Sequence, residues 1–164
     1  MRNYHPPFRT EVLLTVLILT GLFACKSDKE EPIPNEVQGD WQLTAVKSDP
    51  AYTTRGIALT DLLAGFSLVG DTCPSQLTFT FRESGTVQVS GPDECKSTSE
   101  QILGLLEIDN TTTWKRQGDQ LVLTTGANEL SADLQVSETT MTLTSNRLLD
   151  DGITHDISVI FQRL

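Results

Sequence analysis

The chain has 164 residues, a length that fits one ordinary domain. It carries 12 basic and 22 acidic side chains, so its formal net charge is −10. This balance lacks the basic surface that nucleic-acid binding requires and disfavours adsorption onto anionic lipid. The sequence also lacks a glycine-rich phosphate loop and a dinucleotide-binding fingerprint, which argues against a nucleotide-dependent enzyme.

Residues 1–24 have the organisation of a secretory signal peptide. Arg2 and Arg9 precede an apolar run, Val12 to Phe23, which is shorter than the roughly 20 residues of a transmembrane helix. The run ends in Leu22-Phe23-Ala24-Cys25, which resembles the lipobox of bacterial lipoproteins. In that family the cysteine is acylated and becomes the first mature residue, so the resemblance implies a lipid anchor at Cys25. An ordinary secretory signal with a coincidental cysteine is the alternative.

Residues 25–37 are expected to form a flexible tether. The stretch from Lys26 to Val37 is charged, contains two prolines and has almost nothing to bury. Lys26, directly after the cysteine, resembles the same position in lipoproteins sorted to the outer membrane. The resemblance therefore implies a cell-envelope protein of the outer membrane, on its periplasmic face or at the cell surface, with residues 38–164 as its folded domain.

The folded domain is expected to be all-β. Short runs of alternating apolar and polar residues are separated by turn residues roughly every 8–12 positions, which is typical of strands joined by hairpins. Short links make consecutive strands antiparallel, so we predict an eight-stranded meander. The expected strands are residues 41–47, 76–82, 86–90, 112–116, 120–125, 130–136, 140–145 and 156–162.

Two segments depart from this alternation. Residues 60–66 place Leu62, Leu63 and Phe66 at helical spacing, with Thr60 as the expected N-cap. Residues 99–107 are apolar enough for a short helix or a buried strand, and their periodicity does not decide between the two. One or two short helices are therefore expected to cover an end of the barrel.

The two remaining cysteines, Cys73 and Cys95, are expected to form a disulfide, because an exported protein folds in an oxidising compartment. A two-residue turn at Ser84-Gly85 would set Cys73 opposite Lys96, one position from Cys95. Two unrelated reduced thiols are the alternative.

The last hairpin is expected to have a bulge or a longer loop. A two-residue turn at Asp151-Gly152 would mix the apolar faces of its two strands. A loop that is one residue longer would set Leu143 opposite Phe161.

The eight-stranded meander resembles a lipocalin-like barrel. The first strand opens with Gly39-Asp40-Trp41, similar to the Gly-x-Trp of lipocalins, and the chain ends in Gln162-Arg163-Leu164. In that family the tryptophan closes the barrel bottom and an arginine from near the chain end packs across it. The resemblance implies that Gly39, Trp41 and Arg163 close the barrel here, through a cation–π contact. Another β-sandwich or barrel is the alternative.

Few side chains of the predicted mature chain are suited to catalysis or metal binding. His155 is the one histidine after the signal peptide and is expected on the surface near the last turn. The sequence has no second histidine for a zinc site and no evident His–Ser or His–Cys pair for nucleophilic catalysis. We therefore expect no enzyme activity, no metal and no cofactor. Adjacent acids at residues 93–94 and 150–151 leave calcium as a minor alternative.

The barrel interior is the expected site of function. Eight strands enclose a space that side chains can fill or that can hold one small ligand, and an apolar lining suits a lipid-like or aromatic molecule. We expect a non-enzymatic, membrane-anchored module that binds a small apolar ligand; the alternative is a filled barrel that binds an envelope protein or a glycan through its loops. The expected lining residues are Leu77, Phe79, Phe81, Val87, Val89, Leu121, Leu123, Leu134, Val136, Met141, Leu143, Val159 and Phe161.

Overall fold

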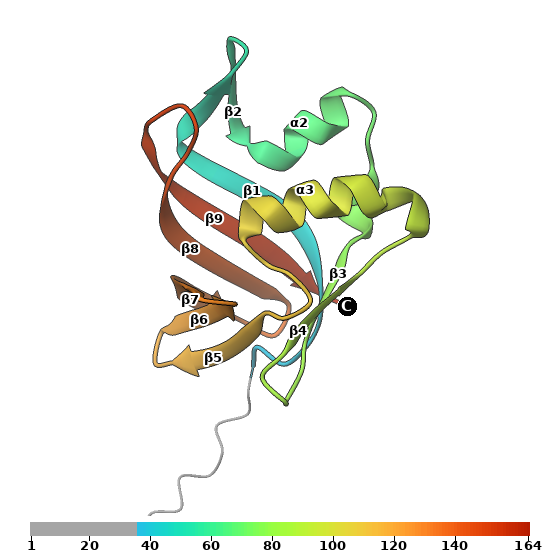
Figure 1. Cartoon of the computed structure of the whole chain (residues 1–164), viewed down its shortest axis with the longest axis vertical. Coiled ribbons are helices and arrows are strands. Elements are labelled where there is room, and N and C mark those ends of the chain that lie inside the picture. The colour runs from blue at the N-terminus through green and yellow to red at the C-terminus, as the bar shows by residue number, and fades with distance from the viewer. Residues whose placement is uncertain (1–35) are drawn as a thin grey trace, which may run out of the picture. The chain divides into compact units, whose positions relative to one another are not determined.

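Nine strands and two α-helices make up residues 36–164, the part of the chain that the computed structural model describes (Figure 1). The predicted signal peptide, Cys25 and the tether up to residue 35 lie outside these residues. The strands are β1 (Gly39–Thr54), β2 (Ile57–Asp61), β3 (Thr78–Phe81), β4 (Val87–Ser90), β5 (Thr113–Gln117), β6 (Gln120–Thr125), β7 (Asn128–Val136), β8 (Thr140–Leu148) and β9 (Thr154–Arg163). The helices are α2 (Leu62–Leu68) and α3 (Lys96–Leu106). Among the described residues, no helix has the length and hydropathy needed to span a membrane.

Eight of the strands form a nearly closed antiparallel barrel, which confirms the predicted fold class. They pair in the order β4-β3-β1-β9-β8-β7-β6-β5, and β2 pairs with the second half of β1. The ring closes between β4 and β5 at one bridge, Thr86 to Thr113, where Trp114 N donates to Gly85 O at 2.7 Å. The sequence did not predict β2, and it predicted a shorter β1 and β8.

The hairpin between β3 and β4 differs by one residue from the predicted register. Phe81 pairs with Val87, and Arg82 N donates to Thr86 O at 2.9 Å, so the turn between them holds three residues. Its last residue, Gly85, takes the left-handed conformation with φ of 80°. Three-residue turns of this type end in a left-handed glycine, which is why the two-residue prediction is wrong. The disulfide between Cys73 and Cys95 is present as predicted, with a Cα–Cα distance of 5.3 Å.

The last hairpin has the longer loop that was expected but a different register. Leu143 pairs with Val159 and Met141 with Phe161, so the prediction that Leu143 faces Phe161 is wrong. Leu148 pairs with Thr154, and Leu149 N donates to Ile153 O at 3.1 Å, so the turn inside this hydrogen bond holds three residues, 150–152. Its length keeps apolar side chains of both strands on the same face.

The largest buried side chains of the core lie near the start of β1. Trp41, Phe79, Phe81 and Phe161 are fully buried, and the rings of Phe79 and Phe161 meet edge to face with centroids 5.2 Å apart. Val37, which the sequence assigned to the tether, is also fully buried and accepts a 2.8 Å hydrogen bond from Trp41 Nε1. Packing therefore begins before residue 38.

Both helices lie on the same side of the molecule, in its upper half in Figure 1. Asp61, and not Thr60, caps α2, because its carboxylate accepts the backbone N–H of Leu63 at 3.1 Å. Residues 99–106 belong to α3 and Glu107 is its C-cap, which resolves the open choice in favour of a helix. Ile102 and Leu106 of α3 are buried in the same core cluster as the strand residues, so α3 packs onto the barrel.

Candidate ligand-binding site

One end of the barrel is closed by the three residues that the Gly-x-Trp resemblance singled out. The Arg163 guanidinium carbon lies 4.1 Å from the centroid of the Trp41 ring. Its nitrogens donate to the backbone oxygens of Gln38 at 2.9 Å and Glu138 at 2.8 Å. Gly39 has φ of 125°, and a Cβ there would lie 2.9 Å from Arg163 Nη1. A larger residue would therefore disturb the arginine that covers this end of the barrel.

Most of the expected lining residues fill the barrel interior. Leu123, Leu143, Val159 and Phe161 do line a cavity, but its volume is only about 30 Å³, enough for one water-sized molecule. The other nine pack into the core or against it: Leu77, Phe79, Phe81, Val87, Val89, Leu121, Leu134, Val136 and Met141. We call the small space the inner cavity.

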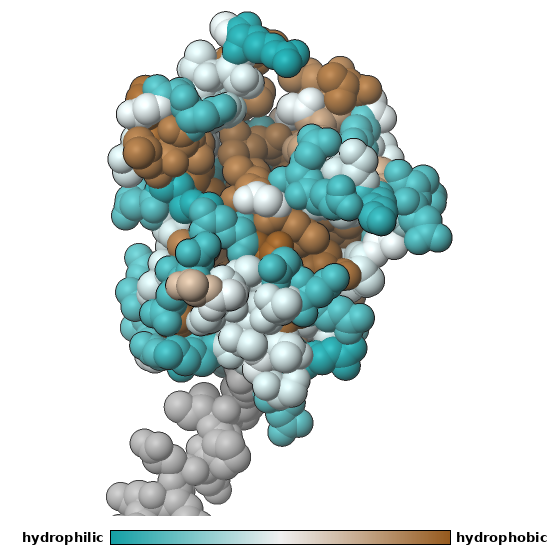
Figure 2. All heavy atoms as spheres, viewed as in Figure 1, coloured by the Kyte–Doolittle hydropathy of each residue, from teal (hydrophilic) through white to brown (hydrophobic). Residues whose placement is uncertain are grey.

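A larger pocket opens at the helix-covered end of the barrel. Its volume is about 420 Å³, within the range of small-molecule sites. Figure 2 shows a hollow with hydrophobic side chains at its floor on this face of the molecule. We call it the outer pocket; its lining residues are Tyr52, Leu59, Leu62, Gly104, Leu105, Glu107, Arg147, Leu148, Leu149 and Asp150.

Three side chains separate the outer pocket from the inner cavity. Leu105, Arg147 and Leu149 line both spaces, so they form the floor of one and the roof of the other. Arg147 extends from β8 on the same face as Leu143, because alternate residues of a strand share a face. A guanidinium thus lies at the boundary of two mostly apolar spaces.

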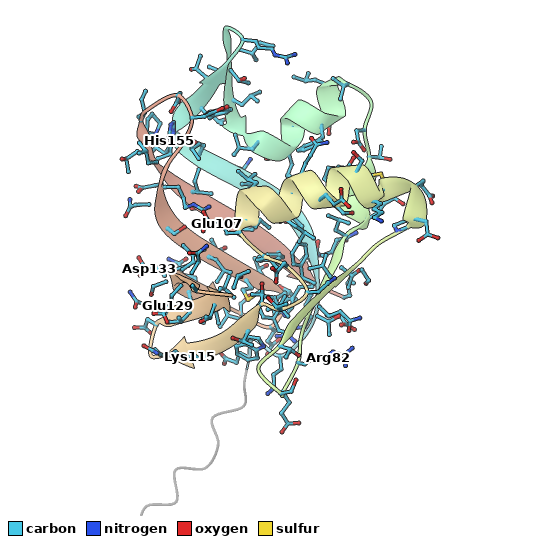
Figure 3. The ribbon with its side chains drawn as sticks, viewed as in Figure 1. Arg82, Glu107, Lys115, Glu129, Asp133 and His155 are labelled. Carbon is cyan, nitrogen blue, oxygen red and sulfur yellow. A yellow bond between two sulfur atoms is a disulfide. The ribbon has the colours of Figure 1, made fainter. Side chains whose placement is uncertain are left out.

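Arg147 is held by the C-terminal end of α3. Its Nη2 donates to the Glu107 carboxylate at 2.6 Å and to Leu105 O at 3.3 Å. The Arg147 side chain is 16% exposed, whereas that of Glu107 is 52% exposed. Figure 3 shows Glu107 at the end of α3, in front of the strands. The sequence reasoning missed Arg147, although it continues the inward alternation of Leu143 and Ser145.

His155 is fully buried, so the prediction of a surface histidine is wrong. β9 begins at Thr154, two residues earlier than the predicted strand 156–162, so His155 belongs to the sheet. Its Nδ1 lies 2.7 Å from Pro50 O, and its Nε2 lies 3.1 Å from the Asp151 carboxylate. The hydrogen bond to Pro50 O, followed by the interactions with Asp151, raises the pKa of His155 despite burial.

Ser48, His155 and Asp151 lie next to one another in the order of a catalytic triad, but their hydrogen bonds do not suit nucleophilic catalysis. Ser48 Oγ lies 3.0 Å from His155 Nδ1, yet it is buried and donates to Pro50 O at 2.9 Å. Because Nδ1 donates to that same carbonyl, it cannot accept the serine proton. The cluster therefore connects β1 to the β8–β9 loop beside the outer pocket.

Within residues 36–164, no three His, Cys, Asp or Glu side chains gather as a metal site would require. The acids at residues 150–151 are engaged locally: Asp150 accepts a 2.7 Å hydrogen bond from Tyr52, and Asp151 contacts His155. The Tyr52 hydroxyl is therefore held at the rim of the outer pocket.

Comparison with known proteins agrees with the fold. The family model described as a lipocalin-like domain matches residues 37–148. No curated protein and no solved structure matches the chain. The family match runs from the buried Val37 to the end of β8, and it includes Gly39, Trp41 and the outer-pocket residues up to Leu148. On this match and on its barrel, the chain belongs to the lipocalin-like domain family.

Proposed function

We propose that this protein is a lipid-anchored module of the bacterial cell envelope that binds a small apolar ligand in the outer pocket. The observation that carries the proposal is the pocket itself, about 420 Å³ in volume and lined by leucines from β2, α2, α3 and β8. Burying an apolar surface of this kind favours binding by roughly 25 cal/mol per Å² removed from water. Function is therefore assigned to the mouth of the barrel, because the inner cavity of about 30 Å³ is too small for such a ligand.

The ligand is tested by native mass spectrometry of the protein purified from the cell envelope. We expect an additional mass that is lost on denaturation and absent from a Gly104→Phe variant. Gly104 faces the outer pocket, and a Cβ there meets no atom within 4 Å, so a larger side chain enters the pocket without a clash. Gln101→Phe places the same ring on an exposed position of α3 and serves as the matched control.

If both variants retain the ligand equally, binding does not occur in the outer pocket. A bare protein mass in every sample would instead favour the alternative function described below.

The membrane anchor is assigned to Cys25, on the lipobox-like sequence that ends there. Stable attachment requires more than one acyl chain, which lipoprotein processing supplies. Cys25→Ala is expected to release the protein from membranes into the soluble fraction, as measured by fractionation and immunoblotting. If the variant still partitions with membranes, the anchor is not at Cys25.

The alternative function, binding of an envelope protein or a glycan through the loops, is supported by a second observation. Large apolar side chains are exposed beside turns, although the aromatic side chains of Tyr52 and Phe66 are half-buried. Substituting aspartate for Leu68 and Val69, which do not line the outer pocket, would abolish capture of a partner without affecting that pocket. The exposed residues are Ile57, Leu68, Val69, Leu148 and Ile153.

A further inference from the structure

His155 lies between two acceptors that only its charged form can serve together. Its Nδ1 lies 2.7 Å from Pro50 O of β1, and its Nε2 lies 3.1 Å from the carboxylate of Asp151 in the loop between β8 and β9. A carbonyl and a carboxylate accept hydrogen bonds and donate none, so both ring nitrogens must carry a hydrogen. The imidazolium ring therefore joins β1 to the β8–β9 loop, at whose base Figure 3 shows it.

A neutral ring would lose one of these two contacts. Neutral imidazole has a single N–H, so its other nitrogen would set a lone pair against Pro50 O or against the Asp151 carboxylate. The Ser48 hydroxyl lies 3.0 Å from Nδ1, but its one hydrogen is already donated to Pro50 O at 2.9 Å. Because His155 is fully buried, two facing acceptors there are costly, and the structure must respond by moving.

The β8–β9 loop is the part best able to move. β1 is held by β2 on one side and by β9 on the other, whereas most residues of the loop are exposed. Leu148, Leu149 and Asp150, at the start of the loop, line the outer pocket. A shift of the loop therefore changes the wall of the outer pocket.

Tyr52 connects His155 to the same wall. The rings of Tyr52 and His155 meet edge to face, with centroids 6.2 Å apart. The Tyr52 hydroxyl donates to the Asp150 carboxylate at 2.7 Å, and both residues line the outer pocket. Movement of the loop away from β1 would break this hydrogen bond, so Tyr52 reports on the position of the wall.

We propose that His155 is a pH-sensitive switch of the outer pocket, whose protonated form holds the β8–β9 loop against β1 and whose neutral form releases the loop and its contact with Tyr52. The use of such a switch rests on the proposed function, because a displaced wall would weaken binding of a ligand in the outer pocket. The movement itself requires no ligand.

The charges on the neighbouring strands leave Asp151 as the direct partner of the ring. Arg147 of β8 is the cross-strand neighbour of His155, and its positive charge is balanced by the Glu107 carboxylate at 2.6 Å. Asp49 of β1 pairs with Asp156, which follows His155 in the chain and therefore points to the opposite face of β9.

The contacts of His155 set the pH range of the switch. The hydrogen bond to Pro50 O, opposed by burial and supported by Asp151, raises the pKa of His155 above its ordinary 6.5. The N–H of Ile153, together with His155, lowers the pKa of Asp151, so this carboxylate stays ionised while the histidine titrates. The loop is therefore held below pH 6.5 and is released as the pH rises through the folded-state pKa of His155.

The inference is tested by an NMR titration of the mature chain from about pH 5 to about pH 10, without a ligand. His155 and Tyr52 are the single histidine and the single tyrosine after residue 24, so each gives one set of ring signals. We expect the His155 signal to titrate with a midpoint above 6.5 and the Tyr52 signal to shift with the same midpoint. The hydrogen bond to Asp150 raises the pKa of Tyr52 above 10, so its own ionisation does not cause that shift.

Three variants separate the switch from other effects of pH. Asp151→Asn removes the anion beside Nε2, so both midpoints should fall together by about one pH unit. Asp133→Asn makes the same change at an exposed position of β7, well away from His155 in Figure 3, and should move neither midpoint. His155→Gln does not titrate and should leave the Tyr52 signal constant; if it fails to fold, Asp151→Asn still decides the test.

The results distinguish this inference from the proposed function. A Tyr52 signal that stays constant while His155 titrates, or that still shifts in His155→Gln, would show that His155 does not control the wall. A His155 midpoint below 6.5 would also overturn the inference, because the ring would not be held in its charged form. Absence of a ligand in native mass spectrometry would refute the proposed function and leave the titration result unchanged.

Discussion

Removal of the Cys73–Cys95 disulfide should lower stability by an amount set by the length of the loop that it closes. The two cysteines are 22 residues apart, and the chain-entropy relation gives about 3 kcal/mol for a loop of this length. The bridge joins the segment before β3 to the residue that precedes α3. Its loss therefore frees the connection that holds α3 near the outer pocket, in addition to the β3–β4 hairpin.

The double variant Cys73→Ala, Cys95→Ala tests this magnitude by thermal unfolding followed by circular dichroism. An unfolding entropy of about 2.1 cal/mol/K per residue over about 130 residues converts 3 kcal/mol into a midpoint lowered by about 11 °C. Reductant should lower the parent midpoint to nearly the same value and leave the variant unchanged. A variant that melts within about 2 °C of the oxidised parent would refute the entropic reasoning for this loop.

Three further predictions concern the core, the closed end and the buried histidine. Phe79→Ala should destabilise the protein by about 3–5 kcal/mol in urea unfolding, and a loss below about 1 kcal/mol would mean that the core collapses around the space. Gly39→Ala should cost more than about 1 kcal/mol because of its positive φ and the clash with Arg163, and a neutral result would show that the arginine moves freely. Since the folded-state pKa of His155 is raised above its ordinary 6.5, the charged form contributes stability that is complete below pH 6.5 and is lost as the pH rises through the folded pKa. The parent midpoint should fall over that window while a His155→Gln variant shows a flatter profile, and parallel profiles would contradict a charged His155 paired with Asp151.

The sequence predicted the strands well because their burial follows the period of two. In β3, Phe79 and Phe81 are buried while the threonines between them are half-buried, which is the pattern that identified the strand. β2 was missed because its residues are exposed or half-buried, so Ile57 to Asp61 shows no apolar alternation. The predicted registers at residues 83–85 and 149–153 were wrong because turn length depends on backbone conformation. The amino acids present in a turn restrict that conformation but do not determine it.

The candidate site was harder to predict than the fold. The inward alternation identified Leu143, Val159 and Phe161, but it could not tell a filled interior from an open one, since that depends on how α3 packs. His155 was assigned to the surface because burial of a histidine depends on partners from elsewhere in the chain, here Pro50 O and Asp151. Arg147 was missed because its significance comes from the two spaces that it separates.

The pairing of β1 with β9 has a consequence for how the protein can be made. Trp41 pairs with Arg163 and Asp49 with Asp156, so one of the two barrel neighbours of the first strand is the last strand. Closing so long a loop is entropically costly, and contacts of this kind form late in folding. Until the final strand has been synthesised, β1 lacks one of its two neighbours and the barrel cannot be completed. Under the export that we propose, the barrel could therefore be completed only after the last strand had crossed the membrane.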